Sequence, residues 1–342
     1  MPSAIIYVFS GTYHTLKTAE MLKNHLEDNQ ILTTTHEVRQ PIERIPVPHS
    51  GDIVGFGYPV HAFNAPQFFL RFVRSLPPAQ NNRAFIFKTS GEPFRINDAS
   101  SCQLYRTLRK KGYDVVLETH MLMPYNIIRR YPDSLVKQMV LYSDAQCRML
   151  TLRLLNGERD LFRYALRHRL ASVLFRIEWF GAWFNGMFYS VDMNQCAQCQ
   201  RCVKLCPAGN ITYDGSRFHF GRNCTMCMRC AMYCPFNAIR IGLLQPWKVN
   251  GGYAFTKITD DPKVPSDFVN PKTKGYFGLF RKFFQNADNA LLAYGITAQD
   301  HTPLPQPEPP ELVLLKDLGK EFDSDQEEQN LDNSNGISYT DQ

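Results

Sequence analysis

The chain has 342 residues, of which 44% are hydrophobic, so it is long enough for two domains with cores of their own. Its formal charge of +6 is unevenly spread: residues 303–342 contain ten acidic residues and two lysines, which leaves 36 Lys and Arg against 22 Asp and Glu, near +14, on the rest. A basic body suits an anionic membrane or an acidic protein partner, whereas no helix-turn-helix, zinc-finger or RNA-recognition pattern supports nucleic acid as a partner.

The N-terminal apolar run Ala4–Phe9 is too short for a signal-peptide core and lacks a basic start, so a cytoplasmic location is expected. The longest apolar region, Leu170–Val191, is interrupted by Arg176 and Glu178, and we expect no transmembrane segment. Ten cysteines in a chain that stays in a reducing cytosol indicate metal or redox chemistry rather than disulfides.

Residues 1–156 alternate short apolar runs, predicted as strands, with stretches of helical periodicity. The five runs are Ala4–Phe9, Thr33–Val38, Asp52–Gly57, Ala84–Thr89 and Tyr113–Thr119. Strands separated by helices predict a doubly wound five-stranded parallel sheet of the α/β class, because parallel neighbours need a crossover connection. One crossover is expected to be irregular, since residues 39–51 contain three prolines.

Two helices are expected after the fifth strand, over Ser134–Leu155 and Phe162–Tyr189. The second would form a helical connector, residues 157–190, with arginines facing water and Leu166, Leu170, Val173 and Leu174 facing protein. A membrane-surface or partner-binding helix is the alternative. Residues 246–301 have no assigned role, although 276–292 are predicted to be helical, and the acidic, proline-containing tail 302–342 is expected to be disordered.

An internal repeat lies within residues 191–245. Each half reads Cys, two residues, Cys, two residues, Cys, three residues, Cys, Pro, and the second half follows the first by 28 positions. The eight cysteines are Cys196, Cys199, Cys202, Cys206, Cys224, Cys227, Cys230 and Cys234. Two-residue gaps let one loop present three thiolates to three corners of an iron-sulfur cubane. Two four-cysteine zinc sites are the alternative, although zinc motifs usually lack the third closely spaced cysteine.

The repeat resembles bacterial-type ferredoxins with two 4Fe-4S clusters, at all eight cysteines and both following prolines. In two-cluster ferredoxins the last cysteine of each run binds the other cluster. One cluster would then be held by Cys196, Cys199, Cys202 and Cys234, and the second by Cys224, Cys227, Cys230 and Cys206. The remaining cysteines, Cys102 and Cys147, are expected to be ordinary packed thiols.

The turn after the first strand is rich in hydroxyl groups and leads directly into a helix. It consists of Ser10, Gly11, Thr12, Tyr13, His14 and Thr15. The free amides and the dipole of a helix N-terminus suit a phosphate group. The turn is similar to the flavodoxin phosphate loop, which binds the monophosphate of FMN, but Tyr13 and His14 replace the usual Gly-Asn. This bulk is expected to narrow the loop, shift the phosphate or prevent flavin binding.

Two further loops support the resemblance, because in flavodoxins they hold the isoalloxazine ring at the carboxyl edge of the sheet. The first loop contains Tyr58, Pro59, Val60, His61, Ala62 and Phe63, and the second contains Thr89, Ser90, Gly91 and Glu92. We expect Tyr58 and Phe63 to stack on the ring and His61 to touch its edge. Taken singly, each aromatic residue fits a core position better than a cofactor contact.

Over residues 1–245 the chain resembles flavodoxin-ferredoxin fusion proteins of anaerobes: a flavodoxin-like domain, a helical connector and an α+β two-cluster ferredoxin-like module. The resemblance implies an electron carrier that passes single electrons through two 4Fe-4S clusters, to or from FMN and a redox partner protein. No catalytic acid or base stands out in the sequence. The alternatives are a flavin-dependent reductase fed by the clusters and a flavin-free ferredoxin with a docking domain. The donor, the acceptor and the oligomeric state are not indicated.

Overall fold

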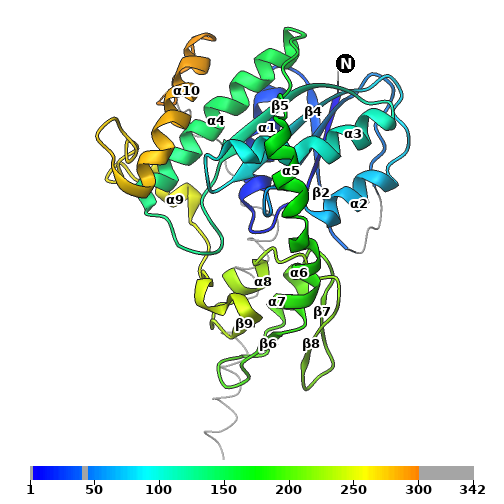
Figure 1. Ribbon diagram of the computed structural model, residues 1–342, viewed down its shortest axis with the longest axis vertical. Coiled ribbons are helices and arrows are strands. Elements are labelled where there is room, and N and C mark those ends of the chain that lie inside the picture. Colours follow the sequence, from blue (N-terminus) through cyan, green and yellow to red (C-terminus); the bar gives the residue numbers. More distant parts are fainter. Residues whose placement is uncertain (1–2, 41–44, 300–342) are drawn as a thin grey trace, which may run out of the picture. The chain divides into compact units, whose positions relative to one another are not determined.

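The computed structural model describes residues 3–40 and 45–299, which lie in one compact unit (Figure 1). Its first domain is built on a parallel sheet with the strand order β2-β1-β3-β4-β5. The strands are β1 (Ser3–Val8), β2 (Leu32–Glu37), β3 (Ile53–Pro59), β4 (Arg83–Ser90) and β5 (Asp114–Leu122). This is the flavodoxin-like order, with its switch point between β1 and β3. The predicted fold class is therefore confirmed.

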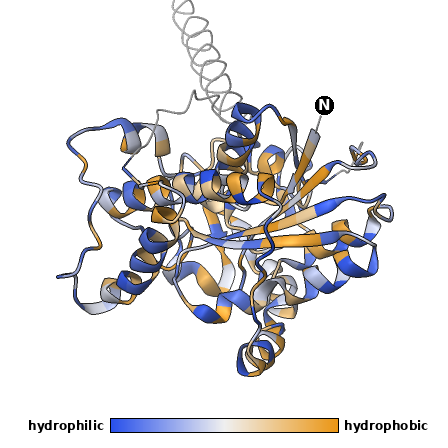
Figure 2. Ribbon diagram, turned by 90° about the horizontal axis from the view of Figure 1, so that it is seen from above, coloured by the Kyte–Doolittle hydropathy of each residue, from blue (hydrophilic) through white to orange (hydrophobic). Residues whose placement is uncertain are grey.

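Helices cover both faces of the sheet (Figure 1). On one face α1 (His14–Asp28) and α4 (Asp133–Leu155) pack together, and on the other α2 (Gln67–Ser75) packs with α3 (Cys102–Lys110), which follows the 3-10 helix η1 (Arg95–Ser101). Successive residues of β1 point to opposite faces: Ile6 joins the first core and Tyr7 the second. Figure 2 shows hydrophobic strands between helices whose hydrophilic sides face outward.

The connector differs from the prediction in two ways. It forms two shorter helices, α5 (Leu166–Leu174) and α6 (Ile177–Gly186), where one long helix was expected. The four side chains expected to face protein are instead exposed: Leu166, Leu170, Val173 and Leu174. The prediction failed because helical periodicity shows which residues share a face but not what that face meets. Within the described residues no helix has both the length and the apolar character needed to cross a membrane.

The cysteine-containing part forms a small α+β module with repeated elements. The strands β6 (Tyr189–Val191) and β9 (Ile239–Ile241) pair antiparallel, as do β7 (Ile211–Tyr213) and β8 (Phe218–Phe220). Each cysteine run contains a short helix, α7 (Arg201–Leu205) in the first and α8 (Arg229–Met232) in the second. The two helices start 28 positions apart, which is the period of the sequence repeat.

After the module the chain returns to the first domain. It passes through η2 (Gly242–Trp247), α9 (Phe255–Asp260) and η3 (Gly275–Phe280), and the last helix described is α10 (Arg281–Leu292). Both α9 and α10 pack on α4, and residues from Val249 to Ala298 extend the core on that face of the sheet. The expected helix 276–292 thus begins as a 3-10 helix and continues as α10. The predicted disorder of 302–342 concerns residues outside the described ranges.

Candidate cofactor-binding site

The two cysteine loops have the same backbone conformation. A left-handed residue precedes each short helix, Gln200 (φ 53°) in the first run and Met228 (φ 64°) in the second. In each run the first and last sulfur atoms accept a backbone N–H bond from a residue at an equivalent position. These bonds are Gln198 N to Cys196 Sγ (3.3 Å), Asn210 N to Cys206 Sγ (3.2 Å), Met226 N to Cys224 Sγ (3.5 Å) and Ala238 N to Cys234 Sγ (3.3 Å). Such bonds stabilise thiolate ligands of iron-sulfur clusters and adjust their potential.

The fold brings the last cysteine of each run close enough to cysteines of the other run for their charges to interact. Burial raises the pKa of the Cys196 and Cys202 thiols, to about 12 for Cys202, and the charge of Cys234 adds to both shifts. In the second run, burial likewise raises the pKa of each of the three thiols, and Cys206 is the cysteine from the first run that acts on all of them. These pairs are compatible with the crossed arrangement, which stays a prediction.

These donor sets fit an iron-sulfur group in their chemistry. Each set contains four thiols, and a thiolate is the ligand that iron in a cubane prefers. A buried thiolate needs a cationic partner, because burial alone disfavours the charged form. Within the described residues no three metal-ligating side chains are gathered closely enough for a single metal ion.

The loop from Ser10 to Thr15 joins β1 to α1, and its side chains are buried. Two hydroxyl groups already have protein partners: Ser10 Oγ accepts the Leu16 N–H (3.3 Å), and Thr15 Oγ1 lies 2.7 Å from Thr89 Oγ1. Tyr13 precedes α1 with φ 66°, a conformation that favours glycine and costs a tyrosine about 1–3 kcal/mol. Its neighbours must therefore hold it in place.

Arg229 of the second cysteine run contacts this loop through its guanidinium group. Its guanidinium is fully buried and donates to Gly11 O (2.6 Å), to Ser10 O (2.7 Å) and to the Glu37 carboxylate. It also lies over the Tyr13 ring, 4.3 Å from the centroid. These four contacts, made by a fully buried side chain, make Arg229 a strong polar link between the loop and the cysteine module.

Close packing leaves no space between the loop and the module at Gly11. A Cβ atom at Gly11 would lie 2.9 Å from the carbonyl oxygen of Cys227, which is shorter than a van der Waals contact. The Tyr13 ring packs edge-on against Tyr233, 5.2 Å between centroids, and His14 packs against Tyr253 and Phe255. The two residues that replace Gly-Asn therefore contact the C-terminal half of the chain.

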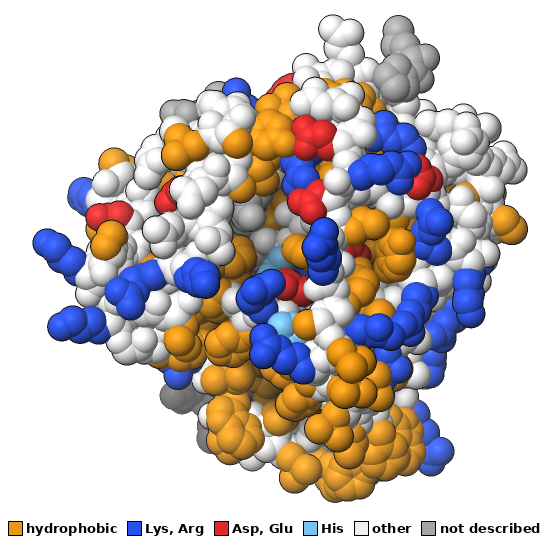
Figure 3. Space-filling view, turned by 45° about the horizontal axis from the view of Figure 1, so that its top comes forward, with side chains coloured by type: hydrophobic (Ala, Val, Ile, Leu, Met, Phe, Trp, Pro, Cys, Tyr) orange, Lys and Arg blue, Asp and Glu red, His pale blue; other side chains and the backbone are white. Residues whose placement is uncertain are grey.

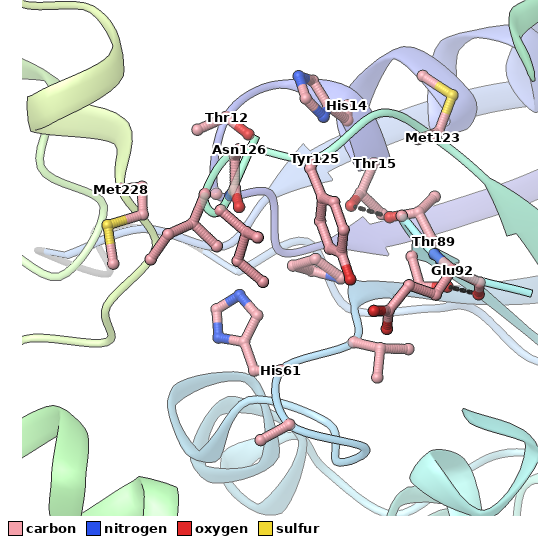
Figure 4. A pocket seen from close by; sticks show the side chains of 18 of the residues that line it. Thr12, His14, Thr15, His61, Thr89, Glu92, Met123, Tyr125, Asn126 and Met228 are labelled. Carbon is pink, nitrogen blue, oxygen red and sulfur yellow. Dashed lines mark hydrogen bonds between the residues drawn. The ribbon is translucent and has the colours of Figure 1, made fainter. Parts of the chain in front are cut away.

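A cavity of about 330 Å³ opens at the carboxyl edge of the sheet (Figure 4). Thirteen of the predicted flavin-loop residues line it: Gly11, Thr12, His14, Thr15, Pro59, Val60, His61, Ala62, Phe63, Thr89, Ser90, Gly91 and Glu92. Figure 4 shows Tyr125 and His61 directed toward its middle from opposite sides. Among these lining residues, all in the described part of the chain, none is Lys or Arg.

Three predicted residues do not line the cavity: Ser10, Tyr13 and Tyr58. Tyr58 was expected to stack on the ring, but it is fully buried in the core, where its hydroxyl lies 2.8 Å from Ser100 Oγ and its ring packs against Phe69. Residues of a buried strand alternate between faces, and position 58 belongs to the face that is covered by α2.

The cavity also has walls that the sequence analysis did not predict. One is the loop 123–128 after β5, which includes Tyr125; its place after a strand at the same sheet edge was the available signal. A second wall comes from the cysteine module, through Met226 and Met228. These methionines stand where the first run has Gln198 and Gln200, which are exposed. A third contribution is Glu178 of α6.

Burial keeps the imidazoles of the cavity neutral at physiological pH. It lowers the pKa of both His14 and His61 to about 4, while the Pro124 carbonyl, which lies 2.9 Å from His14 Nδ1, opposes the shift of His14. Burial also raises the pKa of Glu178 to about 7. The walls therefore carry little positive charge, and hydroxyl groups, backbone amides and the α1 dipole are what they offer to an anion.

Comparison with known protein families gives a match for the second cysteine run of the module. Residues 222–240 match the family model of the 4Fe-4S binding domain. The search of curated proteins found no match.

Among solved structures, the rubredoxin oxygen:oxidoreductase of the anaerobe Desulfovibrio gigas is 16% identical with a TM-score of 0.32, over 45% of this chain and 36% of that one. A flavodoxin from the domain Archaea is 13% identical (TM-score 0.31; 45% and 97% covered). The general stress protein 14 of Treponema denticola, a complex with FMN, is 10% identical (TM-score 0.33; 46% and 99% covered). All of these TM-scores are below 0.5. The fold is therefore assigned from the observed strand order and not from these structures.

Proposed function

We propose that this chain, in which a flavodoxin-like domain is joined to a 4Fe-4S binding domain, transfers single electrons between a redox partner protein and a bound FMN through two 4Fe-4S clusters. One observation carries the proposal: Met226 and Met228 of the second cysteine run line the same cavity as three loops at the carboxyl edge of the sheet. A cluster in that run would adjoin a ligand in the cavity.

The cluster ligands we propose are the crossed sets. Cys196, Cys199, Cys202 and Cys234 would hold the first cluster, and Cys224, Cys227, Cys230 and Cys206 the second. Support comes from the electrostatic neighbours of these thiols, from the N–H bonds to the sulfur atoms, and from the identical period of sequence and backbone. Only sulfur donors are present in each set, which suits iron in a cubane.

FMN is supported by the size and chemistry of the cavity. Its volume of about 330 Å³ lies in the range of about 300–1,000 Å³ usual for small-molecule sites. The hydroxyl of Thr12, backbone amides and the amino end of α1 would hold the phosphate, which at a helix N-terminus needs no basic side chain. His61, Phe63 and Tyr125 would flank the ring. Bound FMN supplies the exchange of electron pairs for single electrons.

The replacement of Gly-Asn by Tyr13 and His14 is compatible with this role. Tyr13 does not line the cavity, because its ring packs on Arg229 and Tyr233. His14 does line it, but its neutral imidazole is bonded to the Pro124 carbonyl and packed against Phe255. The substitutions would thus strengthen the contact with the cysteine module and leave the cavity open.

The different exposure of the two runs suggests the direction of the route. Gln198 and Gln200 of the first run are exposed, whereas Met228 of the second is buried beside the cavity. A docked partner would exchange electrons with the first cluster, and the second would connect it to FMN. The basic body would attract an acidic partner.

A flavin-dependent reductase is the second candidate. A groove of about 1140 Å³ shares His61 and Glu178 with the cavity and also reaches Cys224, so a substrate would have room beside the flavin. A flavin-free carrier is the third, since the hydroxyl groups of Ser10 and Thr15 are already bonded within the protein.

Cofactor analysis of the full chain, purified without oxygen, tests these candidates together. Two clusters and one flavin correspond to about eight irons, about eight sulfides and one FMN per chain. Full iron without flavin would favour the docking-domain reading, and turnover of a small molecule without a protein acceptor would favour the reductase. A colourless protein that contains zinc, or no metal, would overturn the proposal.

A further inference from the structure

The segment from Leu166 to Phe188 exposes an unusual number of large apolar side chains. Leu174 and Ile177 are each 72% exposed and Leu166 is 67% exposed. The others exposed in this segment are Leu170, Val173, Phe175, Phe180, Phe184, Met187 and Phe188. Single exposed apolar residues are common on protein surfaces, but a continuous group of this size marks an interaction site.

These exposed side chains lie along two consecutive helices, and we call them the α5–α6 face. Phe180 stacks on Phe184, and Phe184 contacts Phe188 edge-on, with ring centroids 6.1 and 5.1 Å apart. The face continues onto η2, whose Leu243 and Trp247 are also exposed. Figure 3 shows hydrophobic side chains gathered on one side of the molecule, with Lys and Arg side chains beside them.

The fully buried residues of these helices are small or polar. In α5 only Ser172 is buried, and it exchanges hydrogen bonds of 2.8 Å with Asn64. In α6 the buried residues include Asn185, which donates to Ile241 O and accepts the Leu243 N–H. These polar bonds, together with Trp179, which packs against the core, hold the helices to the protein, while most of their other large apolar side chains are exposed. The outward apolar side is therefore built into the fold.

The charge of the segment is purely basic at its surface. Residues 161–190 contain four arginines, Arg163, Arg167, Arg169 and Arg176, and one acidic residue, Glu178. Arg163 and Arg167 are exposed, whereas Glu178 points into the cavity wall. Helices that lie in a membrane interface typically expose leucine, isoleucine and phenylalanine together with arginine. This segment has that composition and no exposed carboxylate.

We propose that the α5–α6 face binds the surface of an anionic lipid bilayer, with its apolar side chains in the headgroup boundary and its arginines on lipid phosphates. A protein partner would need directional polar groups to set its register, about one hydrogen bond per 100–200 Å². The face offers few of them besides arginine, and a lipid surface requires none. The charge near +14 on residues 1–302 has the sign that such a surface attracts. The proposal goes beyond electron transfer and does not depend on either cofactor.

Vesicle flotation of the full, cofactor-loaded chain tests the proposal. We expect binding to vesicles of phosphatidylcholine with phosphatidylglycerol, weaker binding to phosphatidylcholine alone, and release from the anionic vesicles by salt. The double variant Leu174→Ser/Ile177→Ser should bind at least about tenfold more weakly, because two exposed apolar side chains are lost. The variant Arg163→Gln/Arg167→Gln should lose about tenfold on anionic vesicles only.

A matched control variant replaces two exposed apolar side chains that lie outside the α5–α6 face. The variant Leu32→Ser/Leu279→Ser changes residues that are 69% and 56% exposed outside the face, and it should bind vesicles like the wild type. Unchanged binding of Leu174→Ser/Ile177→Ser, or no binding of the wild type to anionic vesicles, would overturn the proposal. So would concentration-dependent self-association without vesicle binding, if the same double variant abolishes it, because the face would then belong to a second copy of the chain.

Discussion

The two cysteine runs have the same spacing and the same backbone conformation but different surroundings. The first run carries Gln198 and Gln200, which are exposed, and the second carries Met226 and Met228, which line the cavity. Ligand spacing determines how a loop wraps its cluster, whereas the residues between the ligands determine what the loop contacts. In the proposed electron route, the first copy of the motif would take the outer position and the second copy the inner one.

The arginines of the two runs show the same contrast. Arg201 begins α7 and is partly exposed, while Arg229, at the equivalent position of α8, is fully buried against the loop 10–15. A fully buried, charged side chain thus connects the second run to the flavodoxin-like domain. The equivalent arginine of the first run is only partly buried. This asymmetry can be tested by changing equivalent positions in the two runs.

The largest effect is expected from the last cysteine of each run. In the crossed arrangement Cys206→Ser should remove the cluster of the second run, and Cys234→Ser that of the first, and each should lower the iron content by about half. Electron paramagnetic resonance of the reduced variants identifies the cluster that is lost. Loss of the first-run cluster in Cys206→Ser would exclude the crossing.

The next effect is expected from Arg229→Met. The change leaves the Glu37 carboxylate and two buried carbonyl groups without their donor, so the free energy of unfolding should fall by about 3–5 kcal/mol. Denaturant unfolding without oxygen measures it. Arg201→Met is the matched control, and we expect a loss below about 1 kcal/mol from it. Equal losses in the two variants would mean that the two runs are anchored alike.

A smaller effect should follow when the intervening residues are exchanged between runs. Met228→Gln places an amide at a position that is 4% exposed, and it should lower the free energy of unfolding by about 1–3 kcal/mol. The reverse change at the exposed position, Gln200→Met, should stay within about 0.5 kcal/mol. Both positions have positive φ, so the backbone conformation does not distinguish them. If Met228→Gln left the free energy of unfolding unchanged, position 228 would not be shielded from water.

The smallest effect is expected on the pH dependence of stability, through His14 in the loop 10–15. The pKa of His14 is about 4 in the folded chain and near 6.5 when unfolded, so its contribution to stability is full above about pH 6.5 and is lost as the pH falls toward 4. In His14→Phe the drop in unfolding free energy between pH 7 and pH 5 should be smaller by about 1–2 kcal/mol. The exposed His49, changed to Phe, serves as the control. A pH dependence that is unchanged in His14→Phe would show that His14 is not sealed from water.

Much of this molecule could be predicted locally. The five strands, the helix α4 and the eight cysteines follow from apolar periodicity and spacing, because these patterns depend on neighbours a few residues away. The same reasoning located the loops after β1, β3 and β4, which meet because the carboxyl ends of parallel strands share one edge.

Other features depend on contacts between distant segments. Periodicity did not show that Leu174 faces outward, that Tyr58 belongs to the core, or that residues after Val249 return to α4. The burial of Arg229 also required Ser10 and Gly11, more than two hundred positions away, to be placed against it. The sequence by itself determined most of the elements and the two cysteine runs, because these patterns are local. The tertiary structure decided which side of each element is covered, because burial depends on what the rest of the chain brings there.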